Sequence, residues 1–175
     1  LKAVAAELHA DDCRYLLVGS TELICALDAK LDLRLSLASS PAPRSGERIC
    51  IVDPDRTPAS SVTLQTPGSP DAARAAVRWL RHGAGLCLNG KAQALLTAPV
   101  NKAAFAAAGL GWKGHTDLLA HLCGVGRVAM MFHAPQLRVV LATIHLPLRE
   151  VPVALTCDGL TGTLRILDHD LRSRF

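Results

Sequence analysis

The chain has 175 residues, a formal net charge of +4 at pH 7, and a composition that is 50% hydrophobic and 19% charged. These values are typical of a globular protein and exclude a disordered chain. The longest apolar runs are about six residues and no basic stripe is interleaved with aromatics, so we expect no membrane span and no nucleic-acid partner.

No targeting signal is apparent at the start, where residues 1–9 read as an amphipathic helix, so we expect a cytoplasmic protein. The six cysteines form no Cys-x-x-Cys pair, which argues against a zinc ribbon or a redox motif. Several of them, such as Cys25 and Cys50, have apolar neighbours. We therefore interpret the cysteines as buried, reduced thiols.

The first half of the chain predicts helices alternating with strands, separated by loops rich in Pro, Ser and Gly at 38–47 and 53–68. In chain order the expected elements are helix 1–9, strand 14–18, helix 21–30, strand 31–37 and strand 48–52. The next helix has a clear start, since Ser69 can cap it, Pro70 suits its first turn and Asp71 suits its positive end. It should end near His82, or continue with a kink to residue 88.

The second half predicts a similar alternation: strand 94–97, helix 100–107, helix 116–122, strand 127–132, strand 137–144 and helix 159–173. Strands that alternate with helices of this size indicate a mainly parallel sheet between helical layers. The expected fold class is therefore α/β.

Three short segments place polar side chains where an apolar segment ends or a helix begins. They are Leu95-Leu-Thr-Ala-Pro-Val-Asn-Lys102, Gly114-His-Thr-Asp-Leu-Leu-Ala120 and Ala142-Thr-Ile-His-Leu-Pro-Leu-Arg149. In α/β folds, ligands bind at the carboxyl ends of the strands. The three segments together predict an enzyme with a single small-molecule site.

Considered alone, Thr116 could simply cap a helix beside a solvent-facing His115, or both could line an anion site at the helix start. His145 could be an ordinary strand-end histidine bonded to backbone. Thr97, Asn101 and Lys102 are weaker candidates, with Lys102 either solvated or close to a bound phosphate.

These segments, together with Val128-Ala-Met-Met-Phe132 and the ending from Leu164 to Phe175, resemble the 4-hydroxythreonine-4-phosphate dehydrogenase family of vitamin B6 (pyridoxal phosphate) biosynthesis. The resemblance covers residues 86–175 closely and the rest loosely. It implies a three-layer α/β/α fold like that of isocitrate and isopropylmalate dehydrogenases, with two lobes and a cleft between them. Residues 1–110 would form most of the first lobe and residues 111–175 the start of the second.

The resemblance also assigns roles. His115 and Thr116 would contact the phosphorylated substrate, and His145 would be one of three histidine ligands to a divalent metal, zinc or else magnesium or cobalt. NAD would be the oxidant, although the chain has no Gly-x-Gly-x-x-Gly motif after a strand. The metal would lower the pKa of the substrate hydroxyl, and the β-keto acid formed would lose carbon dioxide. The general base and the NAD contacts are not identified.

Family members extend well beyond this chain and open with a Gly-Glu-Pro-Ala-Gly-Ile-Gly-Pro-Glu type of turn that it lacks. We therefore expect a fragment or a truncated member, inactive in isolation and with an uncovered apolar face. The family implies a homodimer with the site near its interface. Two alternatives stay open: a dehydrogenase of phosphorylated threonate or erythronate, and an inactive domain that only folds or dimerises.

Overall fold

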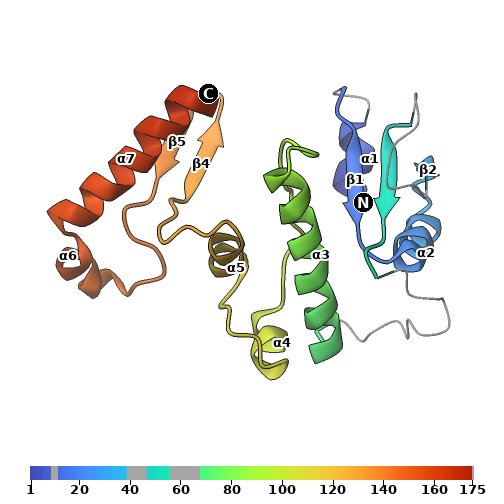
Figure 1. Cartoon of the computed structure of the whole chain (residues 1–175), viewed down its shortest axis with the longest axis horizontal. Coiled ribbons are helices and arrows are strands. Elements are labelled where there is room, and N and C mark those ends of the chain that lie inside the picture. The colour runs from blue at the N-terminus through green and yellow to red at the C-terminus, as the bar shows by residue number, and fades with distance from the viewer. Residues whose placement is uncertain (9–11, 39–46, 56–67, 175) are drawn as a thin grey trace. The chain divides into compact units, whose positions relative to one another are not determined.

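The computed structural model describes residues 1–8, 12–38, 47–55 and 68–174. The chain divides into two compact units, Leu1–Cys123 and Gly124–Phe175, each of which is described by itself (Figure 1). The expected boundary between family lobes, at residues 110 and 111, stays a prediction, as does the cleft between the lobes.

The first unit contains a small parallel sheet. Its strands are β1 (Tyr15–Val18), β3 (Ile49–Val52) and β2 (Leu37–Ala38), and β3 lies in the middle. Tyr15 pairs with Ile49 and Val18 with Val52, so β1 and β3 run in the same direction and end together. All four residues of β3 are buried, which explains why this strand reads as an unbroken apolar run.

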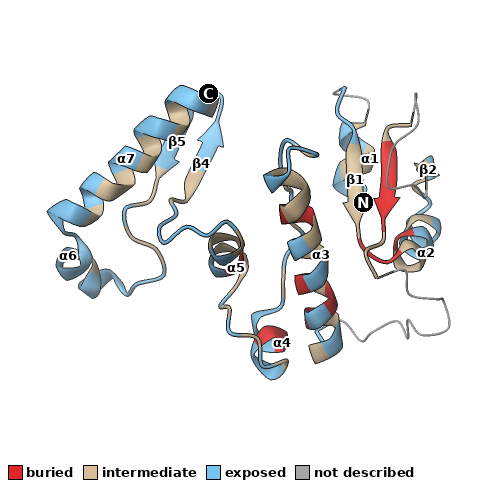
Figure 2. Ribbon diagram, in the orientation of Figure 1, coloured by how far each residue is buried: buried red, intermediate tan, exposed pale blue. Residues whose placement is uncertain are grey.

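Five helices belong to the first unit among its described residues: α1 (Lys2–Glu7), α2 (Thr21–Leu31), α3 (Pro70–Leu88), α4 (Lys102–Ala107) and α5 (His115–Leu122). Helix α3 contacts β1, α4 and α5, and α2 contacts β3. The helical core consists of small residues of α3 packed on α4 and α5, with Phe105 and Leu118 almost fully buried at its centre. Figure 2 shows the buried residues gathered on β3, α3 and α4.

Helix α3 begins as expected, because the Ser69 hydroxyl accepts a hydrogen bond from the Ala72 N–H at 3.2 Å. It does not end near His82 but continues to Leu88. Gly83 does not end the helix. Its missing side chain instead lets Leu95 approach closely, since a Cβ at this position would lie 2.8 Å from Cδ1 of Leu95. The end at His82 was therefore wrong, and the alternative end at residue 88 is confirmed.

The second unit pairs a hairpin with a long helix. Strands β4 (Met131–Ala134) and β5 (Leu137–Val140) are antiparallel, with Met131 opposite Val140. A 3-10 turn, Leu148–Glu150, and the short helix α6 (Val151–Ala154) lead to α7 (Cys157–Arg174). A groove of about 660 Å³ lies between the hairpin and α7 and is mostly apolar, with Met131, Val140 and Ile166 in its lining.

Several expected strands are shorter, shifted or missing in the described residues. Residues 31–37 were expected to be a strand, but α2 includes Leu31, and Asp32 and Arg34 have left-handed φ values of 48° and 54° that break the extended conformation. Residues 94–97 pair with no described strand, and Leu96 is 85% exposed. An apolar segment becomes a strand only when a neighbouring strand accepts its backbone hydrogen bonds, and sequence pattern does not show that neighbour.

The hairpin strands also differ from the expected ranges. Strand β4 begins at Met131 instead of residue 127 and continues past the expected end at residue 132 to Ala134. Strand β5 ends at Val140 instead of residue 144. Of the described cysteines, all six are free thiols, as expected, but only Cys50 is buried and four are exposed. The expectation of buried thiols was wrong for those four, because apolar sequence neighbours do not ensure burial.

The α/β fold class is confirmed. The parallel order β1-β3-β2, with α3 packed on β1 and α2 on β3, follows from the alternation of strands and helices in the sequence.

Candidate substrate site at the start of helix α5

Helix α5 starts without a capping side chain. Its N-cap residue is Gly114, so no side chain is available to accept a hydrogen bond from the first turn. Thr116, expected as the cap, instead lies in the first turn behind His115. In contrast, Ser20, Ser69 and Asn101 each cap their helices through a side-chain oxygen. The first turn of α5 therefore offers N–H groups and the positive end of the helix dipole.

Leu118 fixes this helix start in place. Its side chain is completely buried and packs in the cluster formed with α3 and α4. One residue earlier, the Asp117 carboxylate turns back and accepts a hydrogen bond from the Lys113 N–H at 3.1 Å. The burial of Leu118 and the hydrogen bond between Lys113 and Asp117 together fix the position of the segment that leads into α5.

One side-chain nitrogen of His115, the first residue of α5, lacks a hydrogen-bond partner in the described part of the chain. The Nε2 atom of His115 is buried and has no hydrogen-bond partner among the described residues. A buried polar atom without a partner costs about 1–3 kcal/mol, so native proteins rarely leave one unsatisfied. Ligand binding beside the helix start would satisfy this nitrogen, which agrees with the expectation that His115 contacts a substrate.

The structure shows different roles for the neighbouring Asn101 and Lys102. The Asn101 side-chain oxygen accepts from the Ala104 N–H at 3.0 Å, so this residue is the N-cap of α4. Its Nδ2 also lies 2.9 Å from the position that a Cβ on Gly68 would take. Asn101 is therefore a structural residue. The Lys102 side chain extends toward α5, with Cε 3.7 Å from the position of a Cβ on Gly114.

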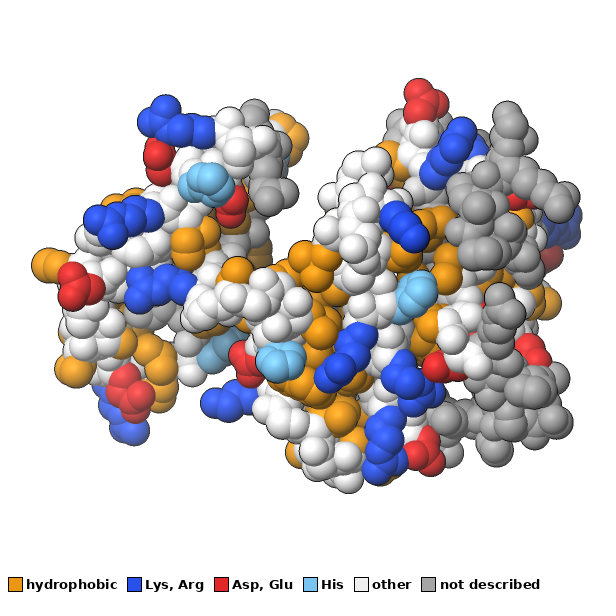
Figure 3. All heavy atoms as spheres, viewed as in Figure 1, with side chains coloured by type: hydrophobic (Ala, Val, Ile, Leu, Met, Phe, Trp, Pro, Cys, Tyr) orange, Lys and Arg blue, Asp and Glu red, His pale blue; other side chains and the backbone are white. Residues whose placement is uncertain are grey.

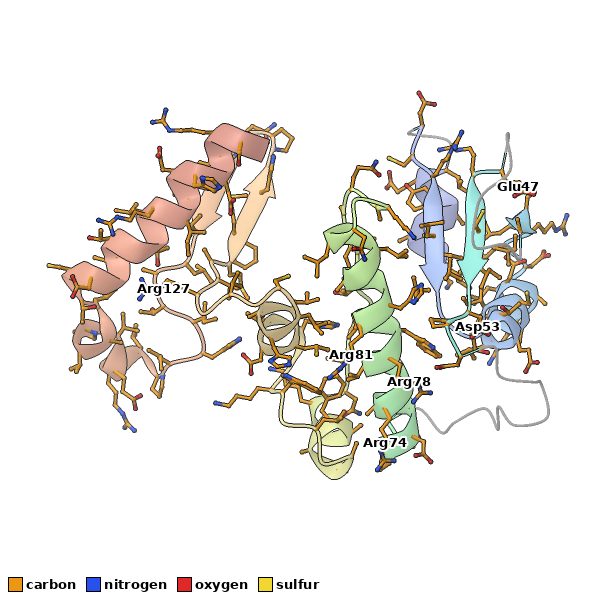
Figure 4. The ribbon with its side chains drawn as sticks, viewed as in Figure 1. Glu47, Asp53, Arg74, Arg78, Arg81 and Arg127 are labelled. Atoms are coloured by element: carbon orange, nitrogen blue, oxygen red, sulfur yellow. The ribbon has the colours of Figure 1, made fainter. Side chains whose placement is uncertain are left out.

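An aromatic contact connects the same segment to α3. The guanidinium carbon of Arg81 lies 5.3 Å from the centre of the Trp112 ring, within the range of a cation–π interaction. On α5, the exposed His121 ring lies 5.8 Å from Trp112. Figure 4 shows Arg81 projecting from α3 together with Arg74 and Arg78, and Figure 3 shows Lys and Arg side chains gathered over this helix.

A second polar cluster, at the carboxyl end of the parallel sheet, forms hydrogen bonds between elements of the fold. Asp55, just after β3, accepts hydrogen bonds from Arg78 Nε at 2.9 Å, Arg78 Nη2 at 3.1 Å and Trp79 Nε1 at 3.2 Å. The hydrogen bonds from Arg78 hold the pKa of Asp55 below its usual range. Asp53 accepts from the Thr21 N–H at 2.9 Å. These carboxylates attach helices to the sheet. Sequence reasoning left them unassigned, although two acids directly after a buried strand were a visible signal.

His145 belongs to the second unit and lies in a loop between β5 and the 3-10 turn, not directly at a strand end. It is exposed and has a left-handed φ of 57°, which is uncommon outside glycine. Within the described part of the chain, no group of three or more His, Cys, Asp or Glu side chains could hold a metal ion. His145 could supply one ligand, but these residues do not complete a metal site. Further along the chain, Arg149 and Glu150 form an exposed ion pair at 3.9 Å.

The convergence of His115, Thr116 and His145 on one cleft stays a prediction, because His145 lies in the other unit. Within the first unit, the structure brings together the uncapped start of α5, the buried nitrogen of His115 and the side chain of Lys102. These features define an α/β protein with a candidate anion-binding site at a helix N-terminus.

Comparison with known proteins gives the family. The family model described as "Pyridoxal phosphate biosynthetic protein PdxA" matches residues 11–175. The chain belongs to the PdxA family.

Individual relatives agree with this assignment. A 4-hydroxythreonine-4-phosphate dehydrogenase of Chromobacterium violaceum is 36% identical over 170 residues, covering 95% of this chain and 50% of the relative. One from Marinobacter nauticus is 49% identical over 89 residues, 51% of this chain and 26% of that protein. A crystal structure of such a dehydrogenase from Burkholderia phymatum has a TM-score of 0.78 and 29% identity, over 94% of this chain and 50% of its own. The chain thus spans half or less of the length of these relatives.

Proposed function

We propose that the protein is an NAD-dependent, divalent-metal-dependent dehydrogenase that oxidises the C3 hydroxyl of 4-phosphooxy-L-threonine in pyridoxal phosphate biosynthesis. The resulting β-keto acid would lose carbon dioxide. Membership of the PdxA family supports this reaction, as do relatives named for it. The substrate is a small phosphorylated hydroxy acid, which needs an anion site in the protein.

The observation that carries the proposal is the buried, unpartnered Nε2 of His115 at the uncapped start of α5. A phosphate bound there would accept hydrogen bonds from the first-turn N–H groups, from Thr116 and from His115, and would lie at the positive end of the helix. We assign substrate binding to His115 and Thr116 on this basis.

The metal and NAD assignments come from the family. His145 is proposed as one ligand of a divalent cation, zinc or else magnesium or cobalt, and further ligands are required beyond it. When bound, such an ion supplies a Lewis acid for a substrate hydroxyl. We assign no catalytic step to these residues. A homodimer and a cytoplasmic location are proposed from the family alone.

Two other functions stay in competition. A dehydrogenase of phosphorylated threonate or erythronate would use the same α5 site, because the substrate amino group need not contact His115 or Thr116. A domain that folds or dimerises without catalysis is also compatible with a chain that covers half of its relatives. A direct activity assay distinguishes these three functions.

Because the 175-residue chain is expected to be inactive in isolation, the assay uses a form of the protein extended to the length of its relatives. It would be incubated with NAD, a divalent metal and either 4-phosphooxy-L-threonine or 4-phosphoerythronate, and NADH formation would be followed by absorbance. Turnover of the first substrate supports the proposal, and a preference for the second supports the alternative. A folded protein that turns over neither contradicts both. His115→Ala should abolish binding of the active substrate, whereas His169→Ala, on the exposed surface of α7, serves as the control.

A further inference from the structure

Lys102 belongs to the first of the three sequence motifs, and its role remained open between a solvated side chain and a contact to a bound phosphate. It begins α4, a separate helix from α5, and its side chain reaches toward Gly114. The glycine leaves this space open, since a Cβ at Gly114 would contact Cε of Lys102 at 3.7 Å. The ammonium group of Lys102 is one bond beyond Cε, so it lies close to the start of α5.

No acidic partner competes for this ammonium among the described residues. The side chain of Lys102 forms no ion pair or hydrogen bond with another described residue. The acid of the first turn of α5, Asp117, is bonded to the Lys113 N–H. The Lys102 side chain thus lies close to an uncapped helix start, and the first residue of that helix, His115, has a buried and unsatisfied imidazole nitrogen. An anion bound at this helix start would be attracted by the cation and could accept hydrogen bonds from the helix.

We propose that Lys102 belongs to the same binding site as His115 and Thr116 and supplies a positive charge to it. This inference rests on the proposed function, because it takes the start of α5 as the substrate site. The N–H groups and His115 provide directed hydrogen bonds, and Lys102 provides a charge that selects a phosphate-bearing ligand over a neutral one. Lys102 is thus a binding residue for the phosphate group.

The arrangement distinguishes Lys102 from the other nearby cations. Arg81 is placed over the face of Trp112, and Arg78 is bonded to Asp55. Lys113 is exposed and adjacent in sequence to Gly114, which makes it a matched control for a general effect of positive charge. If charge density alone mattered, Lys102 and Lys113 would be equivalent.

The test is equilibrium dialysis of the full chain against radiolabelled inorganic phosphate at constant ionic strength. Wild type would be compared with Lys102→Gln, Lys102→Arg, Lys113→Gln and His115→Ala, with circular dichroism and thermal melting to verify that each variant is folded. Lys102→Gln should weaken phosphate binding about tenfold, the loss expected for one charge-assisted hydrogen bond. Lys102→Arg should retain most of the affinity, and Lys113→Gln should change it less than about twofold.

Wild-type affinity in Lys102→Gln, or equal losses in Lys102→Gln and Lys113→Gln, would overturn the role of Lys102. If His115→Ala still abolished binding in that case, the substrate site at α5 would stand without Lys102. Unchanged binding in His115→Ala would instead contradict the proposed substrate site, and absence of phosphate binding by the wild type would overturn both assignments.

Discussion

Asp55 and Arg78 form a two-pronged ion pair that attaches the end of strand β3 to helix α3. The Nε and Nη2 atoms of Arg78 donate to the two carboxylate oxygens of Asp55 at 2.9 and 3.1 Å. Trp79, the next residue on α3, donates to the same carboxylate. One acidic side chain therefore fixes the rotation of α3 against the sheet, and α3 in turn packs against the helix that carries His115.

Asp55→Asn should destabilise the chain by about 1 kcal/mol, since it weakens three hydrogen bonds at a partly buried site. The control is Asp71→Asn, which breaks the exposed Arg74–Asp71 pair and should cost about 0–0.5 kcal/mol. Urea unfolding followed by circular dichroism measures both. Equal effects in the two variants would show that the Asp55 pair is an ordinary surface pair.

The same pair predicts a pH dependence of stability. The pKa of Asp55 is lowered in the folded chain, mainly by the hydrogen bonds from Arg78. A carboxyl with a lowered folded-state pKa contributes stability that is fully present above its unfolded pKa, about 3.9, and is lost as the pH falls through the folded pKa. The difference in unfolding free energy between wild type and Asp55→Asn should therefore shrink below about pH 4. A difference that stays constant down to lower pH would contradict the assignment.

Gly83 and Gly85 should respond differently to alanine although both lie inside α3. At Gly85 a Cβ meets nothing within 4 Å, so Gly85→Ala should stabilise the chain by about 0.5–1 kcal/mol through helix propensity. At the buried Gly83 the added methyl group would meet Leu95 at 2.8 Å, which should cancel or reverse that gain. Thermal melting of both variants decides this, and an equal gain at the two positions would contradict the close approach of Leu95.

Leu118→Ala should cost about 3 kcal/mol, because the side chain is fully buried in the cluster that holds α5 on α3 and α4. The loss should also weaken phosphate binding, since the start of α5 would no longer be held in place. Leu88→Ala, at a 60% exposed position near the end of α3, should change stability by less than about 0.5 kcal/mol. Denaturant unfolding of the two variants is the measurement.

The apolar surface of the second unit should make the isolated 175-residue chain self-associate. Phe132 and Leu137 on the hairpin are 59% and 63% exposed, and Leu164 on α7 is 60% exposed. Leu164→Lys should reduce association in sedimentation velocity experiments without unfolding the helix. A wild-type chain that is monomeric and melts cooperatively would show that this surface is tolerated in water.

In an active form of the enzyme, His145→Ala should mainly abolish metal-dependent turnover, because a lost ligand leaves the cation loosely held. Thr116→Ala should mainly weaken substrate binding, by about 1–2 kcal/mol if it removes one charge-assisted hydrogen bond. Steady-state kinetics at varied metal and substrate concentrations separate the two effects. A loss of substrate affinity in His145→Ala with unchanged metal dependence would contradict the metal role.

Local signals in the sequence were sufficient for the α/β class, the buried strand β3 and the helix that starts at Ser69, because capping, period and apolar runs act over a few neighbouring residues. The motifs around His115 likewise indicated the family before any fold was considered. The strand expected at 94–97 was not found, because pairing depends on a partner that is distant in sequence. Thr116 was expected as a cap, but the cap is Gly114, because helix ends shift by a residue or two with little local signal.

Only the tertiary structure decided which polar residues serve the fold and which are left for a ligand. Asn101 and Lys102 are adjacent in the sequence, yet Asn101 caps α4 while the side chain of Lys102 extends to Gly114 on another element. Likewise, the sequence provided His115 as a candidate, but only packing in three dimensions buried its Nε2 without a partner. The physical reason is that the sequence gives the chemical type of each side chain. Its burial and its hydrogen-bond partners depend on segments that are distant in sequence and that folding brings together.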